Sequence, residues 1–192
     1  MNNYSINKYN FSSSTSGLDF VKYFKGEEDW LQNYEPILDY VKANLPANVN
    51  TVIIFGCASG RDFIPFQDTF TCAGFDIAPF ETINWVCKTD NLHYFECSVE
   101  DFMLNIENFE VEWQNTLVYS QGTLMYVSHD NQTKLVKLLI DKGCKNLVFH
   151  EYPKSAYHEC FNPAQEVLSL FERKHFRATV ETQPTGFLYL NK

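Results

Sequence analysis

The chain has 192 residues, of which 45% are hydrophobic, and its 15 Lys and Arg against 24 Asp and Glu give a formal net charge of −9. This length and apolar content predict one folded domain and exclude a fully disordered chain. The acidic balance argues against binding to nucleic acids or anionic membranes, which depends on clustered Lys and Arg. A small uncharged or cationic partner is the expectation that remains.

The six cysteines lie far apart, with no C-x-x-C pair and no Cys/His spacing typical of zinc. We therefore expect no metal site and reduced, mostly buried thiols. No apolar run approaches the roughly 18 residues of a transmembrane helix, and the first residues lack the basic and apolar regions of a signal peptide. The sequence thus predicts a soluble cytoplasmic protein.

Residues 1–46 differ in texture from the rest of the chain. Residues 1–17 are rich in Asn and Ser and carry no apolar period, which predicts a flexible leader or a lid that orders on ligand binding. From Trp30 to Leu45, apolar residues recur at helical spacing and predict one or two helices. We expect 1–46 to form a leader with lid helices and 47–192 to form the main domain.

After Pro46, short apolar runs alternate with helical stretches. Continuous apolarity suits strands that are buried on both faces. The five runs are 51–55, 71–75, 92–95, 116–119 and 147–150. A helix is predicted from Asn131 to Asp141, and another from the spacing of Ala164, Val167, Leu168 and Phe171. This alternation predicts right-handed crossovers and a parallel sheet.

The C-terminal part breaks this rhythm. Residues 176–181 and 186–190 read as two strands, and the connection between them is too short for a parallel crossover. They are therefore predicted to form an antiparallel hairpin. The expected fold class is α/β, with a doubly wound, mostly parallel seven-stranded sheet, a C-terminal antiparallel hairpin and helices on both faces.

The turn after the first predicted strand reads Phe55-Gly-Cys-Ala-Ser-Gly-Arg-Asp62. Ligands of open α/β sheets bind at the carboxyl ends of the strands. Two glycines four residues apart allow a sharp turn and close approach to a ligand, and the helix expected after them offers N–H groups to anions. The spacing fits neither a dinucleotide fingerprint nor a P-loop. A purely structural glycine turn stays open as the alternative.

Asp76 ends the second predicted strand, 16 residues after Gly60. A carboxylate at this place accepts hydrogen bonds from a ribose diol in nucleotide-binding sheets. The alternative is a cap for a following helix, because the segment from Asp76 to Pro79 also has the composition of a helix start.

These segments resemble the motifs of the class I S-adenosylmethionine-dependent methyltransferases. Residues 54–62 resemble the first motif, 74–79 the second, 98–102 the segment that lines the adenine, and 119–126 the fourth-strand motif. The resemblance covers residues 51–191 and implies a Rossmann-like domain over 47–192 that binds S-adenosylmethionine. The cofactor-binding residues that it implies are Gly56, Cys57, Ala58, Ser59, Gly60, Asp62, Asp76, Ile77, Ser98, Val99, Glu100 and Gln121.

Three positions depart from the family pattern. Ile54 stands where an acidic residue is usual, Ala58 replaces a middle glycine, and Ser98 stands where an Asp commonly contacts the adenine amine. Asp62 is a candidate to replace the missing carboxylate near the methionine end of the cofactor.

Methyl transfer from a sulfonium is an in-line displacement that demands alignment and exclusion of water, so a catalytic base is optional. Acceptor-site candidates follow the fourth and fifth strands: Tyr119, Gln121, Tyr126, His129, Glu151 and Tyr152. Among them His129, Glu151 and Tyr126 are candidate catalytic groups. The alternatives are an ordinary exposed histidine at a helix start for His129 and a solvated loop charge for Glu151.

The predicted core and leader fill all 192 residues and leave no inserted target-recognition domain, which favours a small-molecule acceptor. The leading hypothesis is therefore a small-molecule methyltransferase. A non-catalytic Rossmann-like protein that binds a nucleoside or a partner is the alternative, and use of the cofactor as an aminopropyl donor or by cleavage also stays open. The oligomeric state does not follow from the sequence.

Overall fold

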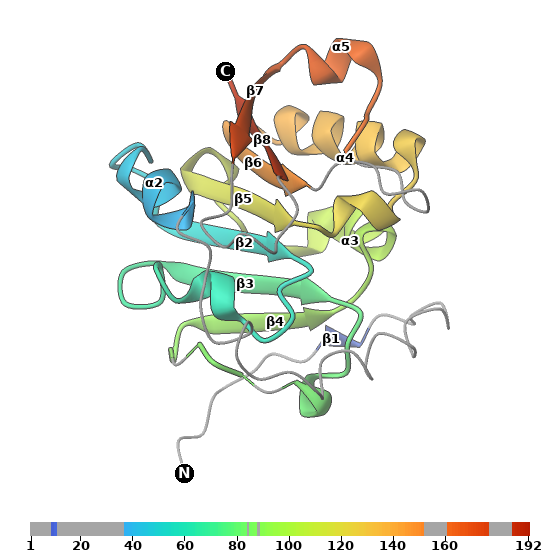
Figure 1. Ribbon diagram of the computed structural model, residues 1–192. Coiled ribbons are helices and arrows are strands. Elements are labelled where there is room, and N and C mark those ends of the chain that lie inside the picture. The colour runs from blue at the N-terminus through green and yellow to red at the C-terminus, as the bar shows by residue number, and fades with distance from the viewer. Residues whose placement is uncertain (1–8, 11–36, 84, 88, 152–160, 177–185) are drawn as a thin grey trace.

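A computed structural model describes residues 9–10, 37–83, 85–87, 89–151, 161–176 and 186–192 (Figure 1). The predicted leader and most of the predicted lid helices lie outside these residues. Within the described part of the chain, no helix has the length and apolar character needed to cross a membrane.

One mixed sheet organises the described residues. Its order is β1-β4-β3-β2-β5-β6-β8-β7, with β8 antiparallel to both β6 and β7 and the other pairs parallel. Figure 1 shows the strands stacked from β1 to β7. The strands are β1 Tyr9–Asn10, β2 Thr51–Phe55, β3 Thr71–Asp76, β4 Leu92–Glu96, β5 Thr116–Gln121, β6 Asn146–Glu151, β7 Phe171–Phe176 and β8 Gly186–Asn191. The predicted fold class is confirmed, and the two-residue β1 joins the seven predicted strands at the edge beside β4.

Helices cover both faces of the sheet. The apolar side chains of α2 Ile37–Ala43 pack with one set of strand residues, and those of α3 Val99–Asn105, α4 His129–Asp141 and α5 Gln165–Leu168 pack with the other set. Helix α4 begins two residues before the predicted start, because the Ser128 side chain accepts a hydrogen bond from the Asn131 N–H at 3.3 Å and caps the helix there.

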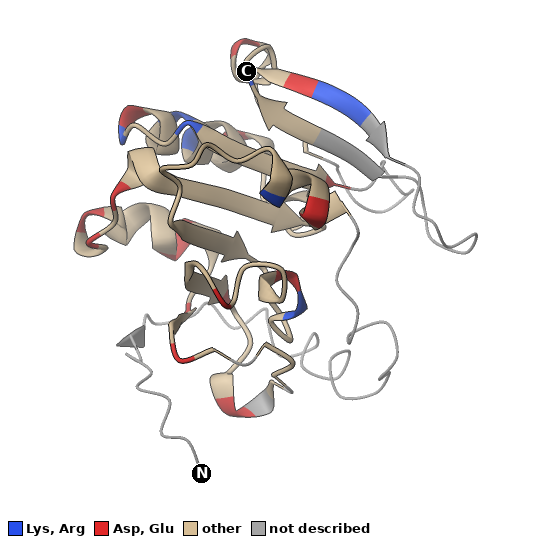
Figure 2. Ribbon diagram, turned by 90° about the vertical axis from the view of Figure 1, so that its left-hand side faces the viewer, with Lys and Arg blue, Asp and Glu red and all other residues tan. Residues whose placement is uncertain are grey.

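The predicted start of the penultimate strand is wrong. Strand β7 begins at Phe171, which the helical spacing had assigned to a helix, and α5 ends at Leu168. Phe171 is buried against the rings of Phe149 and Phe161. Edge strands commonly carry charged residues, and β7 carries three of them in its middle (Figure 2). Because of these charged residues, a prediction based on apolar runs did not identify the segment as a strand. Of the predicted range, residues 177–181 lie outside the described part.

The prediction of a helix after the glycine turn is also wrong. That crossover contains only the 3₁₀ turn η2 Arg61–Phe63 followed by further turns. Pro65 lies in this crossover and lacks the backbone N–H that a continuous helix would require there. The remaining 3₁₀ turns are η3 Phe80–Thr82, η4 Ile106–Asn108, η5 Trp113–Asn115 and η6 Leu124–Tyr126.

Aromatic rings dominate the core beneath α3. The Phe75 and Phe95 rings stack with their centroids 4.7 Å apart, and Phe102 of α3 meets the rings of both Phe55 and Phe75 at 4.9 Å. The five described cysteines are all buried and unpaired, as predicted, and Cys160 lies outside the described residues. Burial raises the pKa of the Cys72 and Cys97 thiols to about 12, so these thiols stay protonated at neutral pH.

Two residues of α3 provide a matched test of this core. Phe102 is fully buried, whereas Leu104 is 83% exposed. We expect Phe102→Ala to lower the free energy of unfolding by about 3–5 kcal/mol through lost contacts and a cavity. Leu104→Ala should change it by less than about 0.5 kcal/mol. Chemical denaturation of both variants measures the difference, and equal losses would contradict this packing.

Candidate functional site

The turn after β2 has a left-handed backbone. Gly56, Ala58 and Gly60 have φ values of +66°, +43° and +75°. The Gly56 N–H donates to the Phe75 carbonyl and the Gly60 N–H donates to the Cys57 carbonyl, both at 2.7 Å. The predicted sharp turn is therefore present. Ala58 adopts the left-handed conformation although its Cβ makes this cost about 1–2 kcal/mol more than for glycine.

Asp76 holds this turn to the end of β3. Its Oδ2 accepts a hydrogen bond from the Ala58 N–H at 2.9 Å, and its Oδ1 accepts one from the Ala78 N–H at 3.0 Å. Burial raises the pKa of the carboxyl group, and these backbone N–H groups oppose that rise. The helix-cap alternative is wrong, because the side chain caps no helix: the following turn η3 begins only after Pro79 and has no side-chain cap.

The glycines of the turn are also needed for contacts within the chain. A Cβ atom added to Gly56 would lie 1.8 Å from Thr123 Oγ1, and one added to Gly60 would lie 2.9 Å from the Trp85 ring. The Val86 N–H donates to the Ser59 carbonyl at 2.9 Å and ties the Trp85 segment to the turn. Glycine spacing signalled a close approach but could not tell which group makes it.

The side chains of other predicted cofactor residues contact neighbouring residues of the chain. The Cys57 side chain is buried, and a Cβ atom added to Gly74 would lie 2.6 Å from its Sγ. Position 74 therefore has no room for a side chain. Asp62 is buried beside Arg61, with 3.2 Å between Arg61 Nε and Asp62 Oδ1. Gln121 Oε1 accepts a hydrogen bond from the Tyr119 hydroxyl at 3.3 Å.

The start of α3 is closed by a capping box. Ser98 Oγ accepts a hydrogen bond from the Asp101 N–H at 3.0 Å, and the Asp101 carboxylate accepts from both the Ser98 hydroxyl and its N–H. Val99 is buried, and Glu100 Oε1 accepts a hydrogen bond from the Asn131 side chain of α4 at 3.1 Å. The three polar side chains of the predicted adenine segment, Ser98, Glu100 and Asp101, thus all make hydrogen bonds within the fold.

Glu151 is fully buried at the end of β6, so its alternative as a solvated loop charge is wrong. Its Oε1 accepts hydrogen bonds from the Ser120 hydroxyl at 3.0 Å and from the Leu124 N–H at 3.2 Å. Burial outweighs these bonds and raises the pKa of the carboxyl group to about 7. The neighbouring His150 is also buried, and burial together with the charge of Arg61 lowers its pKa to about 4.

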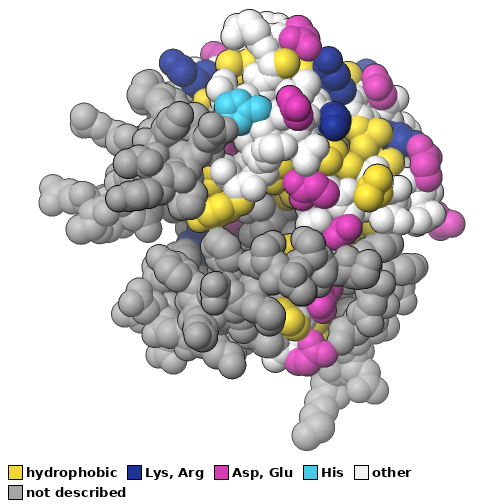
Figure 3. Space-filling model, turned by 90° about the vertical axis from the view of Figure 1, so that its right-hand side faces the viewer, with side chains coloured by type: hydrophobic (Ala, Val, Ile, Leu, Met, Phe, Trp, Pro, Cys, Tyr) yellow, Lys and Arg dark blue, Asp and Glu magenta, His cyan; other side chains and the backbone are white. Residues whose placement is uncertain are grey.

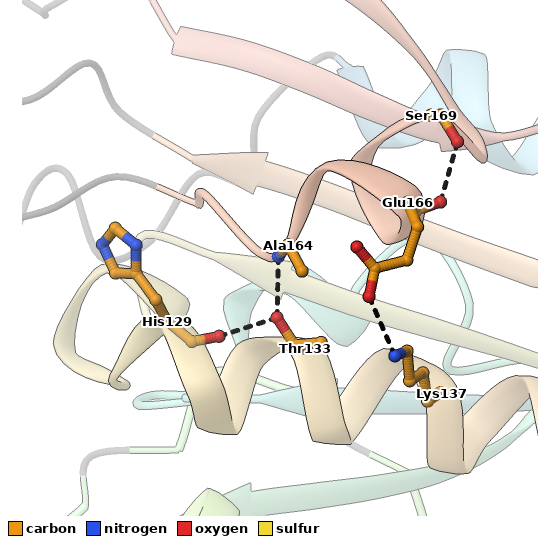
Figure 4. A network of polar contacts seen from close by, with 6 residues as sticks. All are labelled: His129, Thr133, Lys137, Ala164, Glu166 and Ser169. Carbon is orange, nitrogen blue, oxygen red and sulfur yellow. Dashed lines mark hydrogen bonds and ion pairs between the residues drawn. The ribbon is translucent and has the colours of Figure 1, made fainter.

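The other acceptor-site candidates differ in exposure. Tyr119 is fully buried in β5, and Tyr126 is 54% exposed in η6. His129 is half-buried at the start of α4, with its Nδ1 3.5 Å from the Asn162 side chain. Its ring extends from the end of the helix, away from the Lys137–Glu166 ion pair (Figure 4). Tyr152 lies outside the described residues.

Sequence reasoning missed Gln132, whose side chain is fully buried in α4. Its Nε2 donates to the Leu124 and Val127 carbonyls at 2.8 and 2.9 Å, and its Oε1 accepts from the Asn162 N–H at 2.7 Å. A signal was present in the sequence: Gln132 precedes Leu135 by three residues and therefore falls on the apolar face of the helix.

Known proteins resemble this chain in structure but not detectably in sequence. No protein-family model matches the sequence, and no curated protein matches it. Solved structures do match. Magnesium protoporphyrin IX methyltransferase from Synechocystis, crystallised with S-adenosylmethionine, has a TM-score of 0.60 at 14% identity over 93% of this chain and 92% of that chain.

Two further structures agree with it. The 1,6-didemethyltoxoflavin-N1-methyltransferase from Burkholderia thailandensis, crystallised with S-adenosylhomocysteine, has a TM-score of 0.60 at 13% identity over 90% of this chain and 84% of that chain. An N-methyltransferase from Bradyrhizobium japonicum has a TM-score of 0.54 at 13% identity over 81% of this chain and 92% of that chain. This chain has the class I S-adenosylmethionine-dependent methyltransferase fold.

In this methyltransferase fold, three predicted motifs meet at one edge of the sheet. The glycine turn follows β2, Asp76 ends β3 and Ser98 follows β4, and these three strands are neighbours in register, with Phe55 beside Phe75 and Phe75 beside Phe95. Figure 3 views the molecule from the side to which the parallel strands point, where acidic side chains are spread among hydrophobic ones.

The buried Glu151 predicts a measurable pH dependence of stability. Its pKa rises from the ordinary 4.5 to about 7 on folding, so between these values the unfolded chain ionises while the folded protein stays protonated. Its contribution to stability is therefore present at low pH and is lost as the pH rises through 7. The wild-type protein should lose about 3 kcal/mol relative to Glu151→Gln over this range.

Chemical denaturation of both proteins from pH 4.5 to above pH 7 measures this difference. The comparison isolates Glu151 because His150, which titrates in the opposite sense, and Asp76 are present in both proteins. A difference in stability that stays constant with pH would contradict the raised pKa.

Proposed function

We propose that this protein is an enzyme that binds S-adenosylmethionine at the carboxyl ends of β4, β3 and β2 and transfers its methyl group to a small-molecule acceptor. The observation that carries the proposal is the pair of hydrogen bonds that fixes Asp76 between the Ala58 and Ala78 N–H groups. They hold a buried carboxylate beside a left-handed turn at the edge where ligands of open α/β sheets bind.

The residues of this edge fit the cofactor. A carboxylate offers about four lone-pair sites. The Ala58 and Ala78 N–H groups orient the Asp76 carboxylate, the Ile77 N–H also favours its charged form, and acceptor capacity is left for a ribose hydroxyl. Ile77 supplies a half-buried apolar surface next to it, and Val99 supplies a buried one at the start of α3. The bound cofactor supplies a methyl group on a cationic sulfonium.

The acceptor site belongs, in this proposal, to the segments after β5 and β6. Tyr126 and His129 are the candidate groups with exposed surface there, whereas Glu151 is buried and acts on the segment rather than on the acceptor. The net charge of −9 favours a neutral or cationic acceptor. Two of the similar structures are methyltransferases whose names specify magnesium protoporphyrin IX and 1,6-didemethyltoxoflavin, which supports a small-molecule acceptor.

The domain division and the location in the cell follow as parts of the same proposal. Residues 47–192 hold the cofactor, and residues 1–46 serve as leader and lid. The five buried, unpaired cysteines suit the reducing cytoplasm.

One observation favours a second candidate, a non-catalytic protein that binds a nucleoside or a partner. Thr123 and Trp85 already occupy the close approach to Gly56 and Gly60. The need for glycine at positions 56 and 60 is thus explained by contacts within the chain, without a cofactor.

Calorimetric titration with S-adenosylhomocysteine separates the two candidates. We expect the wild-type protein to bind it, and Asp76→Ala to weaken binding by about 1–3 kcal/mol through loss of a charged acceptor. Asp90→Ala, which removes a carboxylate from an exposed loop, is the matched control and should bind normally. A folded Asp76→Ala protein with unchanged affinity would remove Asp76 from the ribose role. No heat at millimolar ligand would refute the first candidate.

Mass spectrometry tests the reaction type. We expect incubation with S-adenosylmethionine and a metabolite extract to yield S-adenosylhomocysteine together with one extract component that has gained a methyl group. An aminopropylated product, or cofactor cleavage without any acceptor product, would contradict methyl transfer.

A further inference from the structure

The peptide groups on either side of Leu124 are held by two fully buried polar side chains from different elements. Glu151 at the end of β6 accepts the Leu124 N–H at 3.2 Å, and Gln132 of α4 donates to the Leu124 carbonyl at 2.8 Å. Leu124 itself is fully buried at the start of η6. The segment that follows β5 is therefore fixed at one residue by both a donor and an acceptor.

Further hydrogen bonds extend this anchoring to neighbouring elements. Ser120 of β5 donates to the same Glu151 oxygen at 3.0 Å, and Gln132 also donates to the Val127 carbonyl at 2.9 Å. The Gln132 oxygen accepts the Asn162 N–H at 2.7 Å, which joins the segment that precedes α5. Burial of a polar side chain costs free energy unless it is hydrogen-bonded, and a Leu at position 132 would fill space without that cost. The polar side chain at this site thus specifies a position rather than only filling volume.

Thr123 links this anchor to the glycine turn. It precedes Leu124 in the chain, and its side chain packs so closely on Gly56 that a Cβ there would lie 1.8 Å from its Oγ1. Asp76 holds the same turn from the β3 side through the Ala58 N–H. Contacts from β3 on one side and from the segment after β5 on the other therefore set the shape of the turn.

We propose that Gln132 and Glu151 are positioning residues for the cofactor turn, acting through Leu124 to hold Thr123 against Gly56. The link to the cofactor rests on the proposed function, whereas the mechanical link from Gln132 to Gly56 does not. The side chains of α4 and β6 thereby control a turn that lies on another strand, and neither of them needs to touch the cofactor.

The test compares two variants of α4. Gln132→Met keeps the length of the side chain but removes its three hydrogen bonds, and Leu139→Ala removes a fully buried apolar contact of the same helix. Hydrogen exchange followed by mass spectrometry reports on peptides that contain residues 56–60 and 122–127, and calorimetry reports the affinity for S-adenosylhomocysteine. Global stability is measured in parallel by chemical denaturation.

We expect Gln132→Met to speed exchange in both peptides and to weaken S-adenosylhomocysteine binding about tenfold. Leu139→Ala, which lowers global stability, should leave affinity and local exchange in these peptides unchanged once exchange is corrected for stability. Glu151→Gln keeps the Oε1 acceptor and should match the wild type in affinity and in local exchange once exchange is corrected for stability, whereas Glu151→Ala should resemble Gln132→Met. This pair keeps the test usable if Gln132→Met does not fold.

Equal exchange in the Gln132→Met and Leu139→Ala proteins, or faster exchange at 122–127 without any change at 56–60, would overturn the positioning role. So would unchanged affinity in a Gln132→Met protein whose 56–60 peptide exchanges faster. A wild-type protein that binds no S-adenosylhomocysteine would instead refute the proposed function, and the exchange comparison would still decide the link from Gln132 to Gly56.

Discussion

The hydrogen bond from the Ala58 N–H to the buried Asp76 carboxylate is the constraint on which the candidate site depends. It joins the turn after β2 to the end of β3, so the loops that follow these two strands are fixed relative to each other. The strand order places β4 on the other side of β3, which brings the capped start of α3 to the same edge. Only the short turn η2 follows the glycine turn, so the Asp76 carboxylate is a main support of the glycine turn.

The sequence predicted the parts of the fold that follow from apolar runs. Strands β2 to β6 carry no Lys or Arg and are buried on both faces, so their identity required no knowledge of the rest of the molecule. The start of strand β7 was not predicted because an edge strand tolerates Glu172, Arg173 and Lys174, so its tertiary position decides its structure. The segment after Gly60 differs, because it contains a local signal against a continuous helix, Pro65, and forms only the turn η2 and further turns.

The candidate site was predicted in outline but not in its contacts. Gly56, Gly60 and Asp76 could be found because turns and strand ends have local signatures. Thr123 and Trp85 could not be found in the same way, because they act across elements whose arrangement is visible only in the folded chain. The place of Gln132 on the apolar face of α4 signalled its burial but not its hydrogen-bond partners. Glu151 shows the same limit: the sequence left it open between a catalytic group and a solvated loop charge, and the folded sheet buries it completely.

Alignment is the main demand of the proposed methyl transfer, and the buried side chains of Asp76, Gln132 and Glu151 hold backbone segments in place. The proposed function requires a ligand to bind at the carboxyl ends of β2, β3 and β4. Backbone amide spectra of the isotope-labelled protein, titrated with S-adenosylhomocysteine, test this requirement. We expect the signals of Cys57, Ser59 and Ile77 to shift, while that of Lys145, which precedes β6 at the opposite end of the strands, stays in place. Saturating ligand that leaves the signals of the glycine turn in place would contradict it.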